Sequence, residues 1–148
     1  MTRRAIVLMT AAGFVLAAAP KYDPKADPNA DLAKAVVEAR RGNKRILVEV
    51  GGEWCGWCHR MHAFFDQNEP LRKLRDDNFV VFQVNFSEEN RNEKFLAQFP
   101  KIEGYPHIFV LDAGGKLLHS QNTGDLEQGK GYNLEMFNAF LKRWALKR

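Results

Sequence analysis

The sequence predicts an α/β domain with a mixed central β-sheet that carries helices on both faces. Two observations favour this class: helix-like and strand-like segments alternate along the chain, and a short turn joins the last two strand-like segments. A strand–helix–strand unit gives a parallel pair with a right-handed crossover, whereas the late turn gives an antiparallel hairpin at the sheet edge. The 148 residues, 45% of them hydrophobic, suffice for one domain with a buried core.

The first elements of the domain are expected to be a helix and a buried strand. The segment 20–30 is rich in proline and polar residues and is expected to be an extended lead-in. Asp31 then caps an amphipathic helix that ends at Gly42-Asn43. The run RILVEV at 45–50 is short and apolar, which indicates a strand buried on both faces. The apolar residues on the inner face of the helix are Leu32, Ala35, Val36 and Ala39.

The middle of the chain is expected to alternate helices with the clearest strand. After the Gly51-Gly52 break, a helix begins at about Cys55 and runs to residue 67. A second short helix over 69–77 opens with an acidic residue and a proline. The strand at 78–86 follows, and a helix over 87–99 ends before a proline.

The last part of the chain is expected to be a hairpin and a closing helix. Strands at 107–112 and 116–121 are joined by the turn at 113–115. A glycine-rich loop over 122–133 leads into a helix over 134–148. The residues expected to face inward from this helix are Leu134, Phe137, Phe140, Leu141 and Trp144.

The first 19 residues have the composition of a cleavable export signal. Arg3 and Arg4 precede an uncharged run that ends in small residues. The run is shorter than the roughly 20 apolar residues that span a membrane, and an uncleaved N-terminal anchor is the alternative. The sequence therefore predicts an export signal over 1–19, a lead-in over 20–30 and a domain over 31–148. The expected location is the periplasm of a bacterium or the secreted fraction.

The charge distribution does not favour nucleic-acid binding. The formal net charge is +4, and part of it comes from the two arginines of the predicted signal. No dense Lys/Arg run with interleaved aromatic residues occurs in the sequence. Nucleic acids are therefore not expected among the partners of this protein.

Cys55 and Cys58 are the two cysteines of the chain, and their spacing suits three chemistries: a redox disulfide, a metal site or covalent haem attachment. A bridge between residues three apart closes too small a loop to stabilise a fold much. If Cys55 starts a helix, the free N–H groups and the helix dipole there stabilise a thiolate and lower the thiol pKa. Cys55 could then attack a substrate disulfide, and Cys58 could resolve the mixed disulfide.

The segment ILVEVGGEWCGWCHRM resembles the active-site segment of the thioredoxin superfamily. VVFQVNF is similar to the central strand of that family, and FPKIEGYPHIFVLDAGGKLL is similar to the segment around its cis-proline and the following hairpin. The resemblance covers residues 31–148 and is nearest to secreted members with tryptophan in the middle dipeptide. It implies the thioredoxin fold and a thiol–disulfide oxidoreductase that acts on protein disulfides without a bound cofactor.

The resemblance also assigns roles to single residues. It makes Cys55 the nucleophile, Cys58 the resolving thiol and Pro106 the cis-proline beside them, whereas the alternative for Pro106 is a trans proline that starts an edge strand. Glu49 matches the buried acid of thioredoxins, which can take the proton of Cys58. The alternative for Glu49 is a strand-end side chain that reaches solvent. Thioredoxins often place a lysine where this chain has Gln83, so the family's ion pair is not carried over.

Aromatic residues are expected to surround the cysteine pair. Trp54, Trp57 and Tyr105, with Gly56 and Pro106, would form a docking patch for unfolded or extended protein substrates. Core packing is the alternative, and it is stronger for Trp54 than for Trp57. Trp57 lies between the cysteines and is expected to point outward. Thioredoxins usually have proline at the position of Trp57.

Three other interpretations stay open on the sequence. The Cys-x-x-Cys-His pattern at 55–59 matches c-type haem attachment, with Met61 or Met136 as the axial ligand, but the downstream pattern has no haem pocket. A zinc site is difficult to build because positions 58 and 59 point to different sides of a helix. The third interpretation is a non-catalytic binding module on the same fold. The zinc ligands would be Cys55, Cys58, His59 and His62.

The redox interpretation requires a protein partner. Protein substrates would supply disulfides or thiols, and a redox partner protein would recharge the cysteine pair. A membrane protein or another thioredoxin-like domain is the expected partner. No cofactor and no metal are expected, and the protein is expected to be a monomer.

Overall fold

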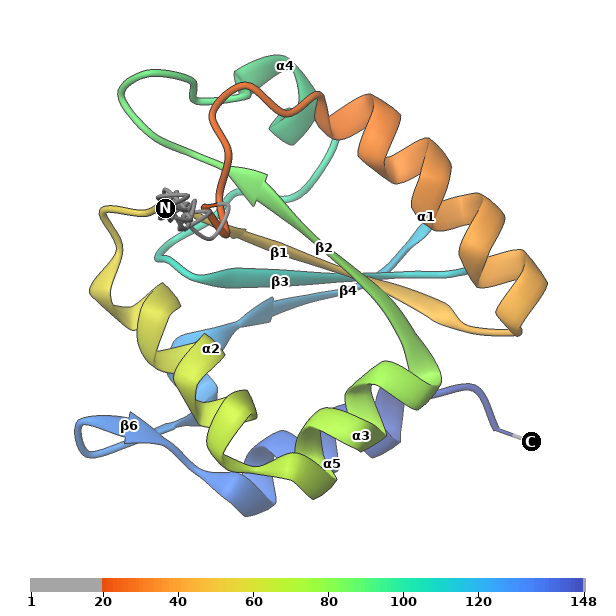
Figure 1. Ribbon diagram of the computed structural model, residues 1–148, viewed down its shortest axis with the longest axis vertical. Helices are drawn as coiled ribbons and strands as arrows, with labels where there is room; N and C mark the ends of the chain where they lie inside the picture. The colour runs from red at the N-terminus through yellow and green to blue at the C-terminus, as the bar shows by residue number, and fades with distance from the viewer. Residues whose placement is uncertain (1–19, 148) are drawn as a thin grey trace, which may run out of the picture.

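A four-stranded mixed sheet forms the centre of the computed structural model, which describes residues 20–147 (Figure 1). The predicted signal over 1–19 lies outside the described residues. The strand order is β2-β1-β3-β4; β1 runs parallel to β2 and antiparallel to β3, and β3 pairs antiparallel with β4. This arrangement confirms the predicted fold class. The strands are β1 (Arg45–Gly51), β2 (Phe79–Asn85), β3 (His107–Leu111) and β4 (Leu117–Asn122).

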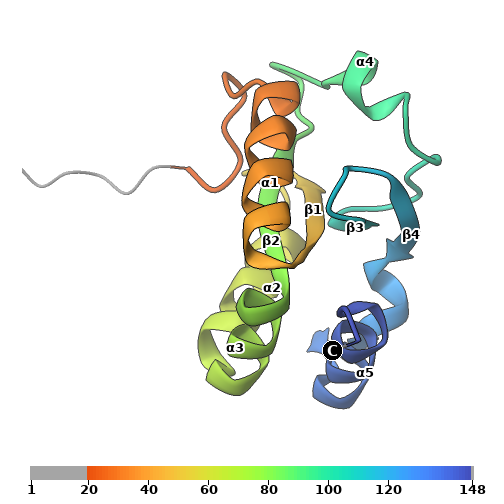
Figure 2. The same ribbon diagram turned by 90° about the vertical axis from the view of Figure 1, so that its right-hand side faces the viewer.

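Helices cover both faces of the sheet (Figures 1 and 2). Apolar side chains of α1 and α4 pack on one face, and those of α2, α3 and α5 pack on the other. Within the described residues the α-helices are α1 (Pro28–Gly42), α2 (Gly56–Gln67), α3 (Glu69–Asn78), α4 (Glu93–Leu96) and α5 (Leu134–Trp144).

Side chains alternate between the two faces along β1, as the pleat of a strand requires. Ile46 and Val48 pack with α1, whereas Leu47 packs with α2, α3 and α5. All of β1 after Arg45 is buried, which confirms the prediction of a strand covered on both faces. Glu49 shares the face of Leu47, so the strand directs its carboxylate toward α2.

The first helix begins earlier than predicted. Asp27, and not Asp31, caps α1: its side chain accepts a hydrogen bond of 2.9 Å from the N–H of Asn29. Pro28 occupies the first turn, where a missing N–H costs nothing. Asp31 lies in that turn, and its own N–H donates to the carbonyl of Asp27. Pro28, the last proline of the predicted lead-in, therefore belongs to the helix start.

The predicted helix over 87–99 is wrong for most of its length, because only the four residues of α4 are helical. Side chains in the preceding loop bond to the backbone and compete with helix formation. Asn85 donates to the carbonyl of Asn90, and Asn92 donates to the carbonyl of Asn85. Asn92 also adopts a left-handed conformation (φ 47°) just before α4.

Two predictions near the C-terminus also need correction. The segment 122–133 contains a short 3-10 helix and a small hairpin of β5 (Glu127–Gln128) and β6 (Gly131–Tyr132), so it is not only a loop. Leu134 is 44% exposed and does not face the core. Phe137, Phe140 and Leu141 are buried as expected, because they continue the stripe that packs on α2 and α3.

Candidate functional site

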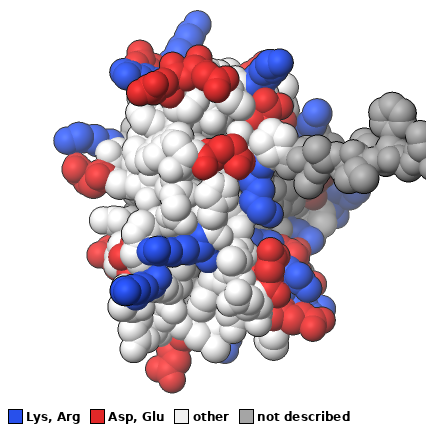
Figure 3. Space-filling model, turned by 60° about the vertical axis from the view of Figure 1, so that its left-hand side comes forward, with Lys and Arg blue, Asp and Glu red and all other residues white. Residues whose placement is uncertain are grey.

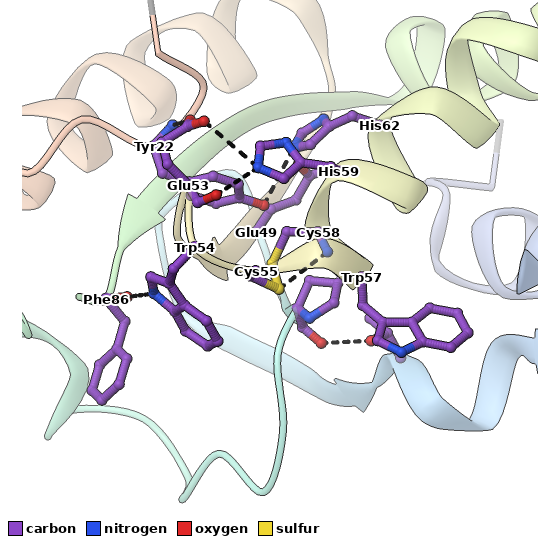
Figure 4. The surroundings of a disulfide bond; sticks show 12 residues. Tyr22, Glu49, Glu53, Trp54, Cys55, Trp57, Cys58, His59, His62 and Phe86 are labelled. Atoms are coloured by element: carbon purple, nitrogen blue, oxygen red, sulfur yellow. Dashed lines mark hydrogen bonds and ion pairs between the residues drawn. A yellow bond between two sulfur atoms is a disulfide. The ribbon is translucent and has the colours of Figure 1, made fainter. Parts of the chain in front are cut away.

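The cysteine pair lies where β1 ends and α2 begins (Figure 4). Cys55 is the N-cap of α2, and its Sγ accepts a hydrogen bond of 3.1 Å from the N–H of Cys58. Cys55 and Cys58 form a disulfide, with Cys58 fully buried and Cys55 3% exposed. The sulfur of Cys55 therefore faces the free N–H groups of a helix start, where a thiolate is stabilised.

Two glycines make room for this site. A Cβ at Gly51 would overlap the sulfur of Cys58 and would lie 3.1 Å from the ring of Tyr22. A Cβ at Gly52 would overlap the indole of Trp54. The sequence indicates these glycines as a strand break. In the structure Gly51 allows close packing of Cys58, and Gly52 allows close packing of Trp54.

Glu49 is buried beside the cysteine pair with three polar side chains around it. It is 1% exposed, so the alternative in which it reaches solvent is wrong. Gln83, its partner on β2, donates a hydrogen bond of 3.0 Å to Oε2. The cation that the sequence lacks on the neighbouring strand comes from α3 instead, since Nη1 of Arg75 lies 3.9 Å from Oε1.

Tyr22 and His62 belong to the same buried group as Glu49. The sequence pattern does not predict that either residue lies beside Glu49. Tyr22 is fully buried and packs against both cysteines. Its hydroxyl lies 3.2 Å from Nε2 of His62, and the same nitrogen lies 3.8 Å from Oε2 of Glu49. The i, i+4 spacing from Cys58 is the signal that could have indicated His62. Tyr22 lies in the lead-in, where the local pattern gave no signal.

Burial changes the acid–base behaviour of Tyr22 and His62. It raises the pKa of Tyr22 far above its ordinary value, with the negative charge of Glu49 as a second cause. Burial lowers the pKa of His62 below 6.5, although Glu49 acts in the opposite direction. Near neutral pH the structure therefore holds a protonated phenol against a neutral imidazole.

Trp54 and Tyr105 form an aromatic wall beside the disulfide. Trp54 is 59% exposed, so core packing is the wrong alternative for it, and its Nε1 donates a hydrogen bond of 2.7 Å to the carbonyl of Phe86. Tyr105 meets Trp54 edge to face and stacks on Phe86. The Tyr105–Pro106 peptide bond is cis, as the resemblance implies. Figure 3, in which the left-hand side of Figure 1 comes forward, shows a broad uncharged surface on this side of the molecule.

Trp57 is packed more than expected. It is half-buried, and its ring meets that of Tyr132 edge to face at 5.5 Å. The guanidinium of Arg60 lies 4.8 Å from the ring centre. The small hairpin of β5 and β6, which the sequence did not predict, therefore supports Trp57. Gly56 is exposed, and a Cβ there would meet no atom within 4 Å.

Two pockets adjoin these residues. One of about 740 Å³ lies between the lead-in and the loop after β2, and Trp54 and Tyr22 line it. The other, of about 420 Å³, lies on the α3 side and reaches the buried group of Glu49, since its lining includes His62, Arg75 and Gln83. The first pocket therefore lies against Trp54 and Tyr22, which adjoin the cysteine pair, and the second lies against the imidazole of His62.

The methionines and histidines that the haem and zinc interpretations require have different surroundings in the structure. Met61 is fully buried in the core, and Met136 is 43% exposed on α5. His59 contacts the carbonyl of Glu53, whereas His62 faces inward to Tyr22 (Figure 4). Residues 20–147 contain no group of three or more His, Cys, Asp or Glu side chains placed to hold a metal ion. In the same residues, no helix is long and apolar enough to cross a membrane.

Comparison with known proteins gives one family. A family model described as thioredoxin-like matches residues 27–113. The disulfide bond reductase DsbH of Chlamydia pneumoniae is 27% identical over 95 residues, which make up 58% of this chain and 57% of that protein. The thiol:disulfide interchange protein DsbD of Pseudomonas fluorescens is 27% identical over 121 residues, which make up 80% of this chain and 19% of that protein. The chain thus spans little more than half of the first relative and a small part of the second.

The fold also has a close counterpart among solved structures. The crystal structure of a disulphide isomerase from Xylella fastidiosa Temecula1 superposes with a TM-score of 0.73 at 22% identity. The superposition covers 86% of this chain and 98% of that chain. At this identity the likeness shows a shared fold.

Proposed function

Because this chain belongs to the thioredoxin-like family and carries a Cys-x-x-Cys pair at a helix start, we propose that it is a thiol–disulfide oxidoreductase that acts on protein disulfides. The observation that carries the proposal is the Cys55–Cys58 disulfide with Cys55 as the N-cap of α2. A helix start stabilises the thiolate, which is the form that attacks a disulfide.

The reaction proceeds through a mixed disulfide. The Cys55 thiolate attacks one sulfur of the substrate disulfide, and the other substrate sulfur leaves with the electron pair. Cys58 then attacks the sulfur of Cys55, which releases the second substrate sulfur and forms the Cys55–Cys58 bond. The substrate gains two electrons and the protein loses two. The reverse steps oxidise a dithiol, and the redox potential against glutathione decides which direction prevails.

Glu49 is the proton acceptor for Cys58 in this proposal. It is buried on the face of β1 that packs against α2, the helix that carries Cys58. Cys58 attacks as a thiolate, so its proton must leave during the resolving step. A carboxylate held beside a buried thiol can take that proton as a general base.

In this proposal, the exposed Trp54, the half-buried Tyr105 and the cis-proline form the substrate-binding part of the site. Trp54, Tyr105 and Pro106 would contact an extended substrate segment around its cysteine, and Gly56 leaves the approach to Cys55 open. Trp57 contributes one edge of its ring, because the other part packs on Tyr132.

The location and partners are proposals as well. An N-terminal export signal would place the domain over 31–148 in the periplasm or outside the cell, where disulfides persist. There a redox partner protein, membrane-bound or itself thioredoxin-like, would recharge the cysteine pair. The protein would act as a monomer, without a cofactor and without nucleic acid.

Trapping of mixed disulfides tests the proposal. Cys58→Ser leaves Cys55 able to attack but removes the resolving thiol, so this variant should accumulate covalent complexes with substrate proteins that dithiothreitol releases. Cys55→Ser is the matched control and should trap none, because Cys58 is fully buried. Non-reducing gels of extracts with each variant measure the difference. Equal trapping by the two variants would reverse or abolish the assigned roles.

A further inference from the structure

Tyr22 reaches the cysteine pair from outside the part of the chain that the family model matches. That match begins at residue 27, whereas Tyr22 lies before it in the lead-in. The tyrosine is nevertheless fully buried and forms a small cluster with Cys55 and Cys58. A residue near a chain end is rarely buried this completely unless its segment is tied down. The lead-in is therefore part of the site and does not only precede the domain.

Hydrogen bonds to other parts of the chain hold the lead-in in place. The N–H of Tyr22 donates to Oε1 of Glu53 across 2.8 Å, and Nδ2 of Asn90 donates to the carbonyl of Pro24 across 2.9 Å. The hydroxyl of Tyr22 lies 3.2 Å from Nε2 of His62, and the two rings meet edge to face. Both the backbone and the ring of the tyrosine are thus fixed.

The ring of Tyr22 lies close to the sulfur of Cys58, beside the bare backbone of Gly51. A Cβ at Gly51 would overlap that sulfur, and the same Cβ would lie 3.1 Å from Cζ and 3.2 Å from the hydroxyl oxygen of Tyr22. Figure 4 shows the tyrosine at the end of the lead-in, with His62 beside it. Since Cys58 is fully buried, the tyrosine ring is one of the walls that keep this sulfur from solvent.

The space next to this wall is open. Tyr22 lines the pocket of about 740 Å³, together with Glu53 and Trp54. A much smaller side chain at position 22 would leave room beside Cys58 that is continuous with this pocket. Small reagents would then reach a sulfur that the packed ring closes off.

We propose that Tyr22 is a positioning residue that decides which sulfur an external disulfide can reach, because its ring closes the lead-in side of Cys58. The inference rests on the proposed disulfide exchange. With the ring in place, a substrate sulfur bonds to Cys55, and Cys58 reacts only with the sulfur of Cys55. Without the ring, the Cys58 thiolate would itself bond to one sulfur of an external disulfide. The other sulfur would leave with the electron pair and take up a proton from solvent.

Alkylation of Cys58 by iodoacetamide tests the closure. In a Cys55→Ser background Cys58 is the one thiol of the chain, so mass spectrometry follows its reaction directly. Adding Tyr22→Ala should raise the rate about tenfold or more, because a buried group reacts only in open forms of the protein. Tyr22→Phe keeps the ring and should stay near the rate of Cys55→Ser alone. Rates across the range of thiol ionisation separate access, which raises the plateau, from a change in the thiol pKa, which shifts the profile.

Oxidised glutathione gives a second readout that concerns the exchange chemistry itself. Cys55→Ser with Tyr22→Ala should form a mixed disulfide between Cys58 and glutathione, visible as an added mass that dithiothreitol removes. Cys55→Ser with Tyr22 or with phenylalanine at that position should form it much more slowly. The difference would show that the ring, and not the hydroxyl, directs external disulfides to Cys55.

Leu141→Ala, also in the Cys55→Ser background, is the matched control for a general loss of stability. Leu141 is fully buried on α5, in a different apolar cluster from Tyr22 and the cysteines. Its truncation leaves a cavity in the core and should not raise the alkylation rate as Tyr22→Ala does. Thermal melting shows whether each variant folds, and Tyr22→Leu replaces Tyr22→Ala if the latter does not.

Three results would overturn the proposal while leaving the proposed function intact. They are an unchanged alkylation plateau in Tyr22→Ala, an equal rise in Tyr22→Phe, and an equal rise in Leu141→Ala. A wild-type protein that exchanges no disulfides would instead contradict the proposed function, and the alkylation rates would still measure the closure of Cys58.

Discussion

Residues that lie far apart in the sequence meet at one site in this protein. Tyr22 from the lead-in, Glu49 from β1 and Arg75 from α3 meet behind one disulfide. Tyr22 and Glu49 are buried, and Arg75 is half-buried. Substitutions at buried polar groups and at tight glycine contacts can be tested one at a time, because each gives a large response.

Glu49→Gln should slow the resolving step and leave the fold intact. Glutamine is nearly isosteric, so the strand should survive, and the loss of a buried charge is not expected to destabilise it. The proton acceptor is lost, so resolution by Cys58 should slow about 10²-fold or more. Attack by Cys55 does not use Glu49 and should stay near the wild-type rate. Stopped-flow kinetics separate the two steps, and an unchanged resolving rate would make Glu49 a structural residue.

Gly51→Ala should destabilise the oxidised protein. The new Cβ would overlap the sulfur of Cys58, and relief requires a shift of packed atoms, which costs about 1–3 kcal/mol. Gly56→Ala is the matched control: its Cβ would meet nothing within 4 Å, and alanine favours the helix by up to about 1 kcal/mol. Urea denaturation of the oxidised variants measures both changes. Equal stability of the two variants would contradict the packing role of Gly51.

At the scale of elements, the ends of α1 and α2 decide where the functional residues lie. Asp27 begins α1 directly after the lead-in, and the same lead-in places Tyr22 against the cysteine pair. Cys55 caps α2 with its own sulfur, so one side chain serves as a helix cap and, in the proposed reaction, as the nucleophile. The starts of the two helices therefore help to position both Tyr22 and the sulfur of Cys55.

Asp27→Ala should destabilise the protein by about 1 kcal/mol, the usual weight of an N-cap side chain. The reason is the loss of its hydrogen bond to the N–H of Asn29. Asp31→Ala removes a carboxylate from the first turn without removing a cap, so its cost should be smaller, about 0.3–1 kcal/mol. The free energies of unfolding in urea measure the difference. A larger loss of stability in Asp31→Ala than in Asp27→Ala would indicate that Asp31 is the N-cap, as the sequence predicts.

At the scale of the whole molecule, the packed sheet encloses a histidine whose protonation opposes folding. His107, the first residue of β3, is 4% exposed and bonds to Ser120 on β4. Burial, together with the charge of His119, lowers its pKa to about 4. Between about pH 4 and the ordinary value of about 6.5, the unfolded chain binds a proton that the folded protein does not.

The stability of wild-type protein should therefore fall as the pH falls from about 6.5 to about 4, by up to about 3 kcal/mol from this group. The lowered pKa of His62 acts in the same direction. His107→Gln removes the titrating group, so the stability of this variant should depend less on pH across that window. Urea denaturation at intervals of pH measures both curves. Parallel curves would show that His107 does not contribute.

The sequence by itself determined the order of most elements and the cysteine pair at a helix start, and its family resemblance implied the cis-proline and the buried acid Glu49. These features follow from local signals: hydrophobic periodicity, glycine and proline positions, and motif spacing, with the family resemblance added. The same local signals led to errors where side chains bond to the backbone, as in the loop before α4. There, hydrogen bonds from asparagine overrode a pattern that otherwise indicates a helix.

Only the tertiary structure decided what surrounds the cysteine pair. Arg75 supplies the cation near Glu49, Tyr132 supports Trp57, and Tyr22 reaches His62 from the lead-in. These partners lie on separate elements, and no local pattern encodes a contact between residues far apart in the chain. The packing of α2 and α3 on one face of the sheet brings them together, because burying that apolar face also encloses the polar groups that lie on it.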